Sequence, residues 1–150
     1  MSITIREIRP DEIEPLIPLL TLAEPSERGL RWGLAHLVDT VYRMEDDGQL
    51  VGAATLRWSD EPCEIQELAI TDERQGQGLG KRFVAWLINE ARRRGKQRLI
   101  VGTANSSIQN IAFYRTCDTI EEAGAEMTAI SAFCNVKFAL MRIHGSSPLR

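Results

Sequence analysis

Apolar residues near the start of the chain recur first at strand spacing and then at helix spacing. The β-branched segment from Ile3 to Ile8 predicts a first strand. After it, four apolar residues follow the i, i+3, i+4, i+7 spacing of one helix face: Ile13, Leu16, Ile17 and Leu20. This spacing predicts a helix with Asp11 as its N-cap, which Pro18 should kink or shorten. A second helix is expected to begin at Ser26, because leucines follow it at helical spacing.

The next part of the chain reads as a hairpin followed by another strand. Segments 41–44 and 49–58 are strand-like. The pair Asp47-Gly48 between them is a strong signal for a tight hairpin turn. Residues 64–70 form a further strand, whose far end is apolar enough to be buried.

A long amphipathic helix is predicted from Leu79 onward, because apolar residues recur there on one helical face. The run Arg92-Arg93-Arg94 followed by Gly95 is typical of a helix C-terminus. Residues 99–101 then predict a short buried strand, and residues 108–115 predict a helix.

Two terminal strands, 126–133 and 136–143, complete the predicted elements, and residues 145–150 read as a flexible tail. Strands and helices in this order predict an α/β fold in which one sheet carries helices on both faces. A chain of 150 residues with 43% apolar side chains supports one core, so residues 1–144 are expected to form a single domain.

Charge and cysteine content exclude several classes of protein. The chain carries 18 basic and 21 acidic side chains, and a net charge of −3 does not favour nucleic acid as a partner. Its apolar runs are too short to span a membrane, and Arg6 interrupts any leader-like segment. Cys63, Cys117 and Cys134 are far apart and form no metal-binding pair. We therefore expect a cytoplasmic protein with reduced thiols and no metal.

The segment Gln75-Gly-Gln-Gly-Leu-Gly-Lys81, called the glycine loop below, lies between a predicted buried strand and the long helix. Glycines at alternate positions let the backbone approach a ligand where a side chain would collide. The start of a helix also presents unpaired N–H groups and a positive dipole end. The glycine loop is therefore suited to a phosphate or pyrophosphate.

Two common phosphate-binding motifs do not fit this segment. A P-loop requires a Ser or Thr after its lysine, whereas Arg82 follows Lys81. A dinucleotide fingerprint requires GxGxxG and an acidic residue on the next strand, and residues 99–103 end without one. A glycine-rich turn without a ligand, or a nucleotide-binding protein of another fold, remain the alternatives.

The pattern Gln75-x-x-Gly78-x-Gly80 after the strand end Leu68-Ala69-Ile70 resembles motif A of the GNAT superfamily of N-acetyltransferases. Downstream, Asn105-Ser-Ser and Tyr114 resemble the next strand and helix of a bacterial subgroup. The resemblance covers residues 3 to 115. It implies a mixed, mostly antiparallel central sheet with helices on both faces.

The resemblance also implies acetyl-CoA as the acyl donor. The glycine loop would hold its pyrophosphate, and the end of the preceding strand would pair with the pantetheine arm as an added strand. Asn105 would hydrogen-bond the pantetheine. The implied cofactor-binding residues are Leu68, Ala69, Ile70, Gln75, Gly76, Gln77, Gly78, Leu79, Gly80, Lys81 and Asn105.

Two residues are the candidates for proton transfer. Tyr114 is implied to lie near the sulfur, and its pKa lies within about two units of that of a thiol, so it suits a general acid. Glu67 is the candidate base, acting through a water and sharing a strand face with Ala69. A core role for Tyr114, and Glu64 in place of Glu67, remain open.

The predicted function is direct transfer of an acetyl group to a primary amine of a small molecule or peptide. The alternative is a catalytically silent acyl-CoA-binding sensor or interaction module of the same fold, and a homodimer is left open. After Tyr114 the sequence departs from the family pattern. Either the helix continues to Gly124, or residues 117–123 form an inserted loop. The acceptor therefore cannot be read from the sequence.

Overall fold

The computed structural model describes residues 1–104, 120–122 and 136–142 of the chain. The chain divides into two compact units. The first comprises Met1–Ser59 and Ile65–Leu87, and the second comprises Asp60–Glu64 and the described residues from Ile88 onward. Asn105, Tyr114, the helix predicted at 108–115, the strand predicted at 126–133 and the tail lie outside the described residues.

Strands of the first unit follow the order β1-β2-β3-β4. They are β1 (Ile3–Glu7), β2 (Thr40–Asp46), β3 (Gln49–Arg57) and β4 (Cys63–Ile70), and β4 belongs to this unit from Ile65 onward. The pairs β1–β2 and β2–β3 are antiparallel. Asp47 and Gly48 connect β2 to β3 with φ of 49° and 83°, so the predicted hairpin turn is confirmed, and β2 continues two residues beyond the predicted strand end at Met44.

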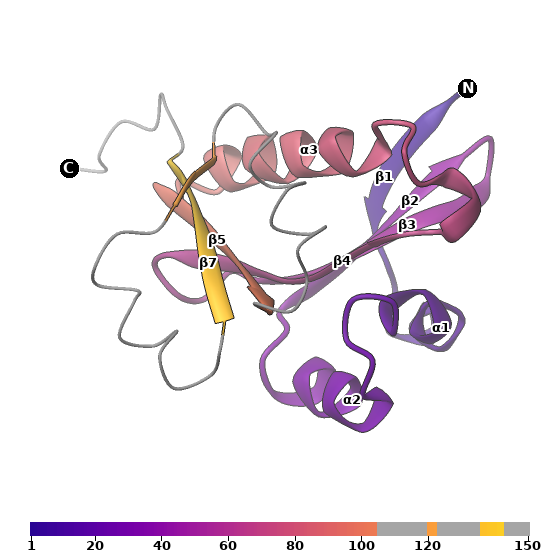
Figure 1. Ribbon diagram of the computed structural model, residues 1–150, viewed down its shortest axis with the longest axis horizontal. Coiled ribbons are helices and arrows are strands. Elements are labelled where there is room, and N and C mark those ends of the chain that lie inside the picture. The colour runs from indigo at the N-terminus through magenta and orange to yellow at the C-terminus, as the bar shows by residue number, and fades with distance from the viewer. Residues whose placement is uncertain (105–119, 123–135, 143–150) are drawn as a thin grey trace. The chain divides into compact units, whose positions relative to one another are not determined.

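Short helices cover one face of these strands (Figure 1). Two 3-10 turns, η1 (Pro10–Glu12) and η2 (Glu14–Leu16), precede α1 (Ile17–Leu20) and α2 (Glu27–His36). Pro18 lies in the first turn of the four-residue α1, in line with the expected shortening. A buried apolar cluster joins these helices to β3 and β4: Leu16, Ile17, Leu19, Leu20, Leu30, Ala53 and Ala69.

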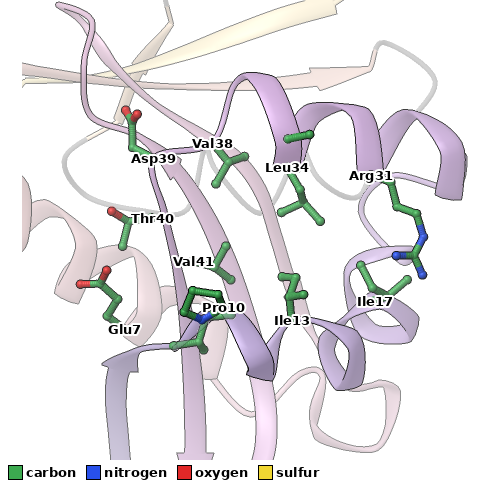
Figure 2. A pocket seen from close by; sticks show the side chains of 12 residues that line it. Glu7, Pro10, Ile13, Ile17, Arg31, Leu34, Val38, Asp39, Thr40 and Val41 are labelled. Carbon is green, nitrogen blue, oxygen red and sulfur yellow. The ribbon is translucent and has the colours of Figure 1, made fainter.

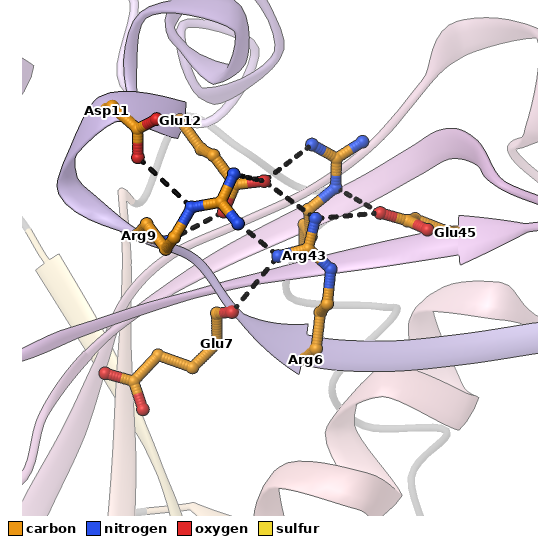
Figure 3. Close-up of polar contacts among 7 residues, drawn as sticks. All are labelled: Arg6, Glu7, Arg9, Asp11, Glu12, Arg43 and Glu45. Atoms are coloured by element: carbon orange, nitrogen blue, oxygen red, sulfur yellow. Dashed lines mark hydrogen bonds and ion pairs between the residues drawn. The ribbon is translucent and has the colours of Figure 1, made fainter.

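The two predicted helix starts in this region have different outcomes. Ser26 is the N-cap of α2, and its Oγ accepts from the Gly29 N–H at 3.1 Å. Asp11 is not an N-cap, because η1 begins one residue earlier and Arg9 occupies that position. Glu12 closes the turn: its carboxylate accepts from the Arg9 main-chain N–H at 2.8 Å and from Arg6 at 2.8 and 3.0 Å (Figure 3).

Helix α3 (Leu79–Arg93) begins on the opposite face of the first unit's strands (Figure 1). Trp86 of α3 makes an edge contact with Tyr42 of β2, with ring centroids 5.0 Å apart. Tyr42 and Met44 of β2 are buried towards this side, whereas Val41 packs against the α1–α2 cluster. The prediction of helices on both faces is confirmed. Gly95, with φ of 74°, follows the end of α3 as expected.

In the second unit, β5 (Arg98–Ala104), β7 (Val136–Arg142) and β6 (Ile120–Glu122) lie in the order β5-β7-β6, all antiparallel. The predicted strand at 99–101 is confirmed, and the one predicted at 136–143 is confirmed over its described residues, 136–142. For this part of the chain the sequence predicted either a helix that continues to Gly124 or an inserted loop at 117–123. Both predictions are wrong at residues 120–122, which form the strand β6. Its pairing with β7 could not be read from three residues alone.

Candidate active site

The chain reverses from β4 into α3 through a 3-10 turn, η3 (Asp72–Arg74), and the glycine loop. The side-chain amide of Gln75 donates to the Ile70 carbonyl at 3.1 Å and to Asp72 Oδ1 at 3.2 Å. Gln75 therefore fixes the start of the loop against the end of the strand, instead of projecting freely towards a ligand.

Two glycines give the loop its shape. Gly76 and Gly78 have φ of 77° and 80°, values that L side chains rarely adopt. A Cβ built at either position meets no atom of the described structure within 4 Å. Glycine is thus required by the backbone conformation, while the space beside it stays open to a ligand.

The start of α3 presents main-chain donors next to this open space. The first helical hydrogen bond runs from the Arg82 N–H to the Gly78 carbonyl at 3.1 Å. The N–H groups of Leu79, Gly80 and Lys81 precede it and have no acceptor within the helix. The Leu79 side chain is buried and anchors the helix end, whereas Lys81 is exposed. This arrangement of amides and helix dipole suits an anion.

A cross-link from a distant strand supports the same loop. Arg74 donates to Gln77 Oε1 at 2.9 Å and to Asp46 Oδ2 at 2.7 Å, at the end of β2. The hydrogen bond from Arg74 lowers the pKa of Asp46 below its ordinary value. The sequence does not predict this link, because its partners lie 28 positions apart and no local pattern joins them.

The candidate base Glu67 lies on β4 beside a buried threonine of β3. Thr55 Oγ1 donates to Glu67 Oε2, and the Glu67 main-chain N–H donates back to Thr55 Oγ1 at 2.9 Å. Burial raises the pKa of Glu67; the Thr55 hydrogen bond opposes this rise, and the negative charge of Glu24 adds to it. The surroundings of Glu67 thus increase the proton affinity of its carboxyl group. Thr55 was not among the predicted site residues, although its hydroxyl in the apolar run Gly52–Leu56 is a signal that could have found it.

A separate pocket of about 460 Å³ lies between η1, α2 and β2 (Figure 2). Arg31 at its edge binds Glu14 at 2.8 Å and Glu27 at 3.0 Å, and Asp39 accepts from the Trp58 and Ser59 N–H groups. The remaining walls are mostly apolar: Ile8, Pro10, Ile13, Ile17, Leu34, Ala35, Val38 and Val41. None of its lining residues belongs to the glycine loop, so this pocket is not the predicted donor site.

The structure also places the predicted cofactor-binding residues of β4 and the alternative base Glu64. Leu68, Ala69 and Ile70 form the end of β4, as predicted, and Thr71 and η3 separate them from the glycine loop. Glu64, the alternative base, belongs to the second unit, whereas Glu67 belongs to the first. Within the described ranges, no three His, Cys, Asp or Glu side chains gather as metal ligands.

Comparison with known proteins identifies the family. The model of the acetyltransferase (GNAT) family matches residues 6–118. The chain belongs to this family. An uncharacterised N-acetyltransferase of Bacillus subtilis, YvbK, is 29% identical over 112 residues, which are 74% of this chain and 71% of that protein.

Solved structures agree with the family assignment. An IAA acetyltransferase from Bacillus cereus is 25% identical with a TM-score of 0.72, covering 94% of this chain and 99% of that one. A GNAT acetyltransferase from Elizabethkingia anophelis, solved with acetyl-CoA bound, is 22% identical with a TM-score of 0.76, covering 93% and 97%. The predicted family, its mixed α/β fold and its class of enzyme, an acyl-CoA-dependent acetyltransferase, are confirmed.

No helix in the described part of the chain is both long and apolar enough to cross a membrane.

Proposed function

We propose that this protein transfers an acetyl group from acetyl-CoA directly to a primary amine, in the cytoplasm. The observation that carries the proposal is the glycine loop at the start of α3. Its two positive-φ glycines leave open space beside the main-chain donors of Leu79, Gly80 and Lys81. The acetyl-CoA held by the Elizabethkingia anophelis relative supports the same donor here.

The residues present fit a diphosphate with a long neutral arm. Main-chain N–H groups of the loop and of the first turn of α3 would donate to the pyrophosphate oxygens. The exposed Lys81 adds a positive charge at the same helix end. The backbone of Leu68, Ala69 and Ile70 would pair with the amides of the pantetheine arm. The Ile70 carbonyl already accepts from Gln75, so we expect Leu68 and Ala69 to provide most of that pairing.

Transfer requires a neutral amine and two proton movements. An ammonium acceptor first loses a proton to Glu67 through a water, and the freed nitrogen lone pair attacks the thioester carbonyl carbon. The new C–N bond forms, the C–S bond breaks, and the nitrogen loses its second proton to solvent, while the proton held by Glu67 returns to Tyr114 before the next turnover. The leaving thiolate takes a proton, for which Tyr114 is the proposed donor. The products are the N-acetyl amine, coenzyme A and one released proton.

Glu67 is well suited to the first of these steps. A carboxyl of ordinary pKa is a weak base towards an ammonium group, and burial raises the pKa of Glu67. Thr55 and Glu24 adjust the carboxyl from neighbouring parts of the same unit. These contacts support Glu67 as the base.

The test is release of coenzyme A from acetyl-CoA across a panel of polyamines, aminoglycosides, amino acids and peptides with free N-termini. We expect thiol release that depends on one class of amine and is matched by acetylated product. Thermal stabilisation by coenzyme A without turnover on any amine would instead support an acyl-CoA sensor. Glu67→Gln should reduce turnover. The matched variant on the same strand, Glu64→Gln, should not reduce it to the same extent.

A further inference from the structure

Thr55 and Glu67 form a closed pair of hydrogen bonds across β3 and β4. The Thr55 side chain is fully buried, with 0% exposure. Its oxygen accepts from the Glu67 main-chain N–H at 2.9 Å, which directs its single proton towards Glu67 Oε2. Among the described residues, the second carboxylate oxygen, Oε1, accepts no hydrogen bond.

We propose that Thr55 is a positioning residue for the acetyl transfer: its hydroxyl holds Glu67 by Oε2 and leaves Oε1 to take the proton from the acceptor. This inference rests on the proposed function, because it assigns a partner to the proposed base. Thr55 does not touch the reacting atoms in this scheme. It acts by fixing one oxygen of the carboxyl and by setting how readily the other oxygen binds a proton.

A hydroxyl at this position is not needed to build the strand. The neighbours of Thr55 along β3 are Ala53, Ala54 and Leu56, all fully buried. Valine has the same shape as threonine and an equal preference for strands, so packing alone would accept it. A buried hydroxyl in an apolar strand is instead costly unless its hydrogen bonds are made. Here both are made to Glu67.

Two neighbours act on the Glu67 carboxyl in opposite directions. The hydrogen bond from Thr55 favours the charged form and lowers its pKa, whereas the negative charge of Glu24 disfavours that form and raises it. Glu24 follows α1 and accepts from the Ser26 N–H at 3.1 Å. Among the described residues of the elements packed against this part of β4, Glu24 is the charged group that acts on Glu67. Removing Thr55 or Glu24 should therefore move the titration of Glu67 in opposite senses.

The test is the pH profile of kcat/KM for the full-length protein with acetyl-CoA and an amine that the panel identifies. The acid side of the profile should report the proton on Glu67. Thr55→Val should move that side to higher pH and reduce kcat/KM there by about tenfold. Thr55→Ser should restore the wild-type profile, and Glu24→Gln should move the acid side to lower pH. Coenzyme A affinity should stay unchanged in all three variants.

Several results would overturn the inference. If Thr55→Val lowers kcat/KM equally at every pH without moving the acid side of the profile, Thr55 is only a packing residue. Failure of Thr55→Ser to restore the wild-type profile would lead to the same conclusion. Thr55→Ala provides a second variant without a hydroxyl, should Thr55→Val not fold. Failure of the proposed base is distinguishable: Glu67→Gln would then keep the acid side of the profile. Failure of the proposed function would appear as absence of turnover in the wild-type protein.

Discussion

Arg74 joins the glycine loop to the far end of the β2–β3 hairpin through a 2.7 Å hydrogen bond from its guanidinium to Asp46 Oδ2. The same guanidinium donates to Gln77 inside the loop at 2.9 Å. One side chain thus couples the loop to a strand end, and both partners of the ion pair are mostly shielded from solvent.

Loss of this link should weaken donor binding more than it weakens the fold. Arg74→Ala removes the contact to Asp46 and the contact to Gln77, so we expect Kd for coenzyme A to rise by roughly three- to tenfold. Asp46→Asn should have a smaller effect, because the contact to Gln77 remains. Isothermal titration calorimetry measures both variants. If Arg74→Ala binds coenzyme A as tightly as the wild type does, donor binding by the loop does not depend on this link.

The acid stability of the protein should depend on Glu12. Hydrogen bonds from the Arg6 guanidinium and the Arg9 main-chain N–H lower its pKa from 4.5 to about 2. Because the folded pKa is the lower one, Glu12 stabilises the fold above about pH 4.5, and this contribution disappears as the pH falls towards 2. Glu12→Gln should lower the free energy of unfolding at neutral pH, where Arg6 and Arg43 face each other across β1–β2.

Denaturant unfolding of wild type and Glu12→Gln from pH 7 to pH 2 checks this. The difference between the two curves should shrink as the pH falls below the ordinary pKa of the carboxyl. A difference that stays constant across this range would show that the Glu12 carboxylate charge contributes nothing to stability.

Helix α2 should depend on one leucine for its packing. Leu30 is fully buried in the cluster that joins α1 and α2 to β3 and β4. Leu30→Ala should cost about 2–5 kcal/mol of unfolding free energy. The matched control is Leu22→Ala, at a leucine that is 48% exposed, and it should stay close to wild type. Comparable losses from both substitutions would contradict the assigned core.

Tyr114 should affect turnover without affecting donor affinity. Tyr114→Phe removes the proposed proton donor, so we expect turnover to fall by roughly 10²- to 10⁴-fold, with coenzyme A affinity nearly unchanged. Steady-state kinetics and calorimetry on the same preparation separate the two effects. Parallel losses in turnover and affinity, or no loss in either, would withdraw the general-acid role.

Local signals in the sequence predicted the elements that depend on neighbouring residues. Asp47-Gly48 predicted a turn, which the structure contains with positive φ values, and Ser26 predicted the start of α2. These succeed because turn and cap chemistry is decided within about four residues. Asp11 failed as a cap because the carboxylate of Glu12 is drawn to Arg6 and to the Arg9 amide, and Arg6 lies on another element.

The supporting contacts of the candidate site could not be predicted in the same way. Glu67 was found from its place on a strand, but its partner Thr55 is twelve residues away on β3. Finding that pair requires the register between two strands, which single-sequence patterns leave open. The Arg74–Asp46 link depends on the hairpin end reaching the loop, a tertiary relationship without a local signal.

The proposed donor site depends most on one position of the glycine loop. Gly78 has φ of 80°, and nothing lies within 4 Å of the place where its Cβ would be. Asparagine and aspartate have the same shape and tolerate this conformation better than most residues, so Gly78→Asn and Gly78→Asp differ mainly in charge. Gly48→Asp places the same residue at a similar φ, 83°, in the hairpin turn and controls for backbone strain.

The direct measurement is the affinity of coenzyme A for these three variants by calorimetry. We predict that Gly78→Asp binds at least about tenfold more weakly than Gly78→Asn, because its carboxylate would stand beside the pyrophosphate. Gly48→Asp should bind as wild type does. Wild-type affinity in Gly78→Asp would show that the diphosphate is held elsewhere and would contradict the proposed donor site.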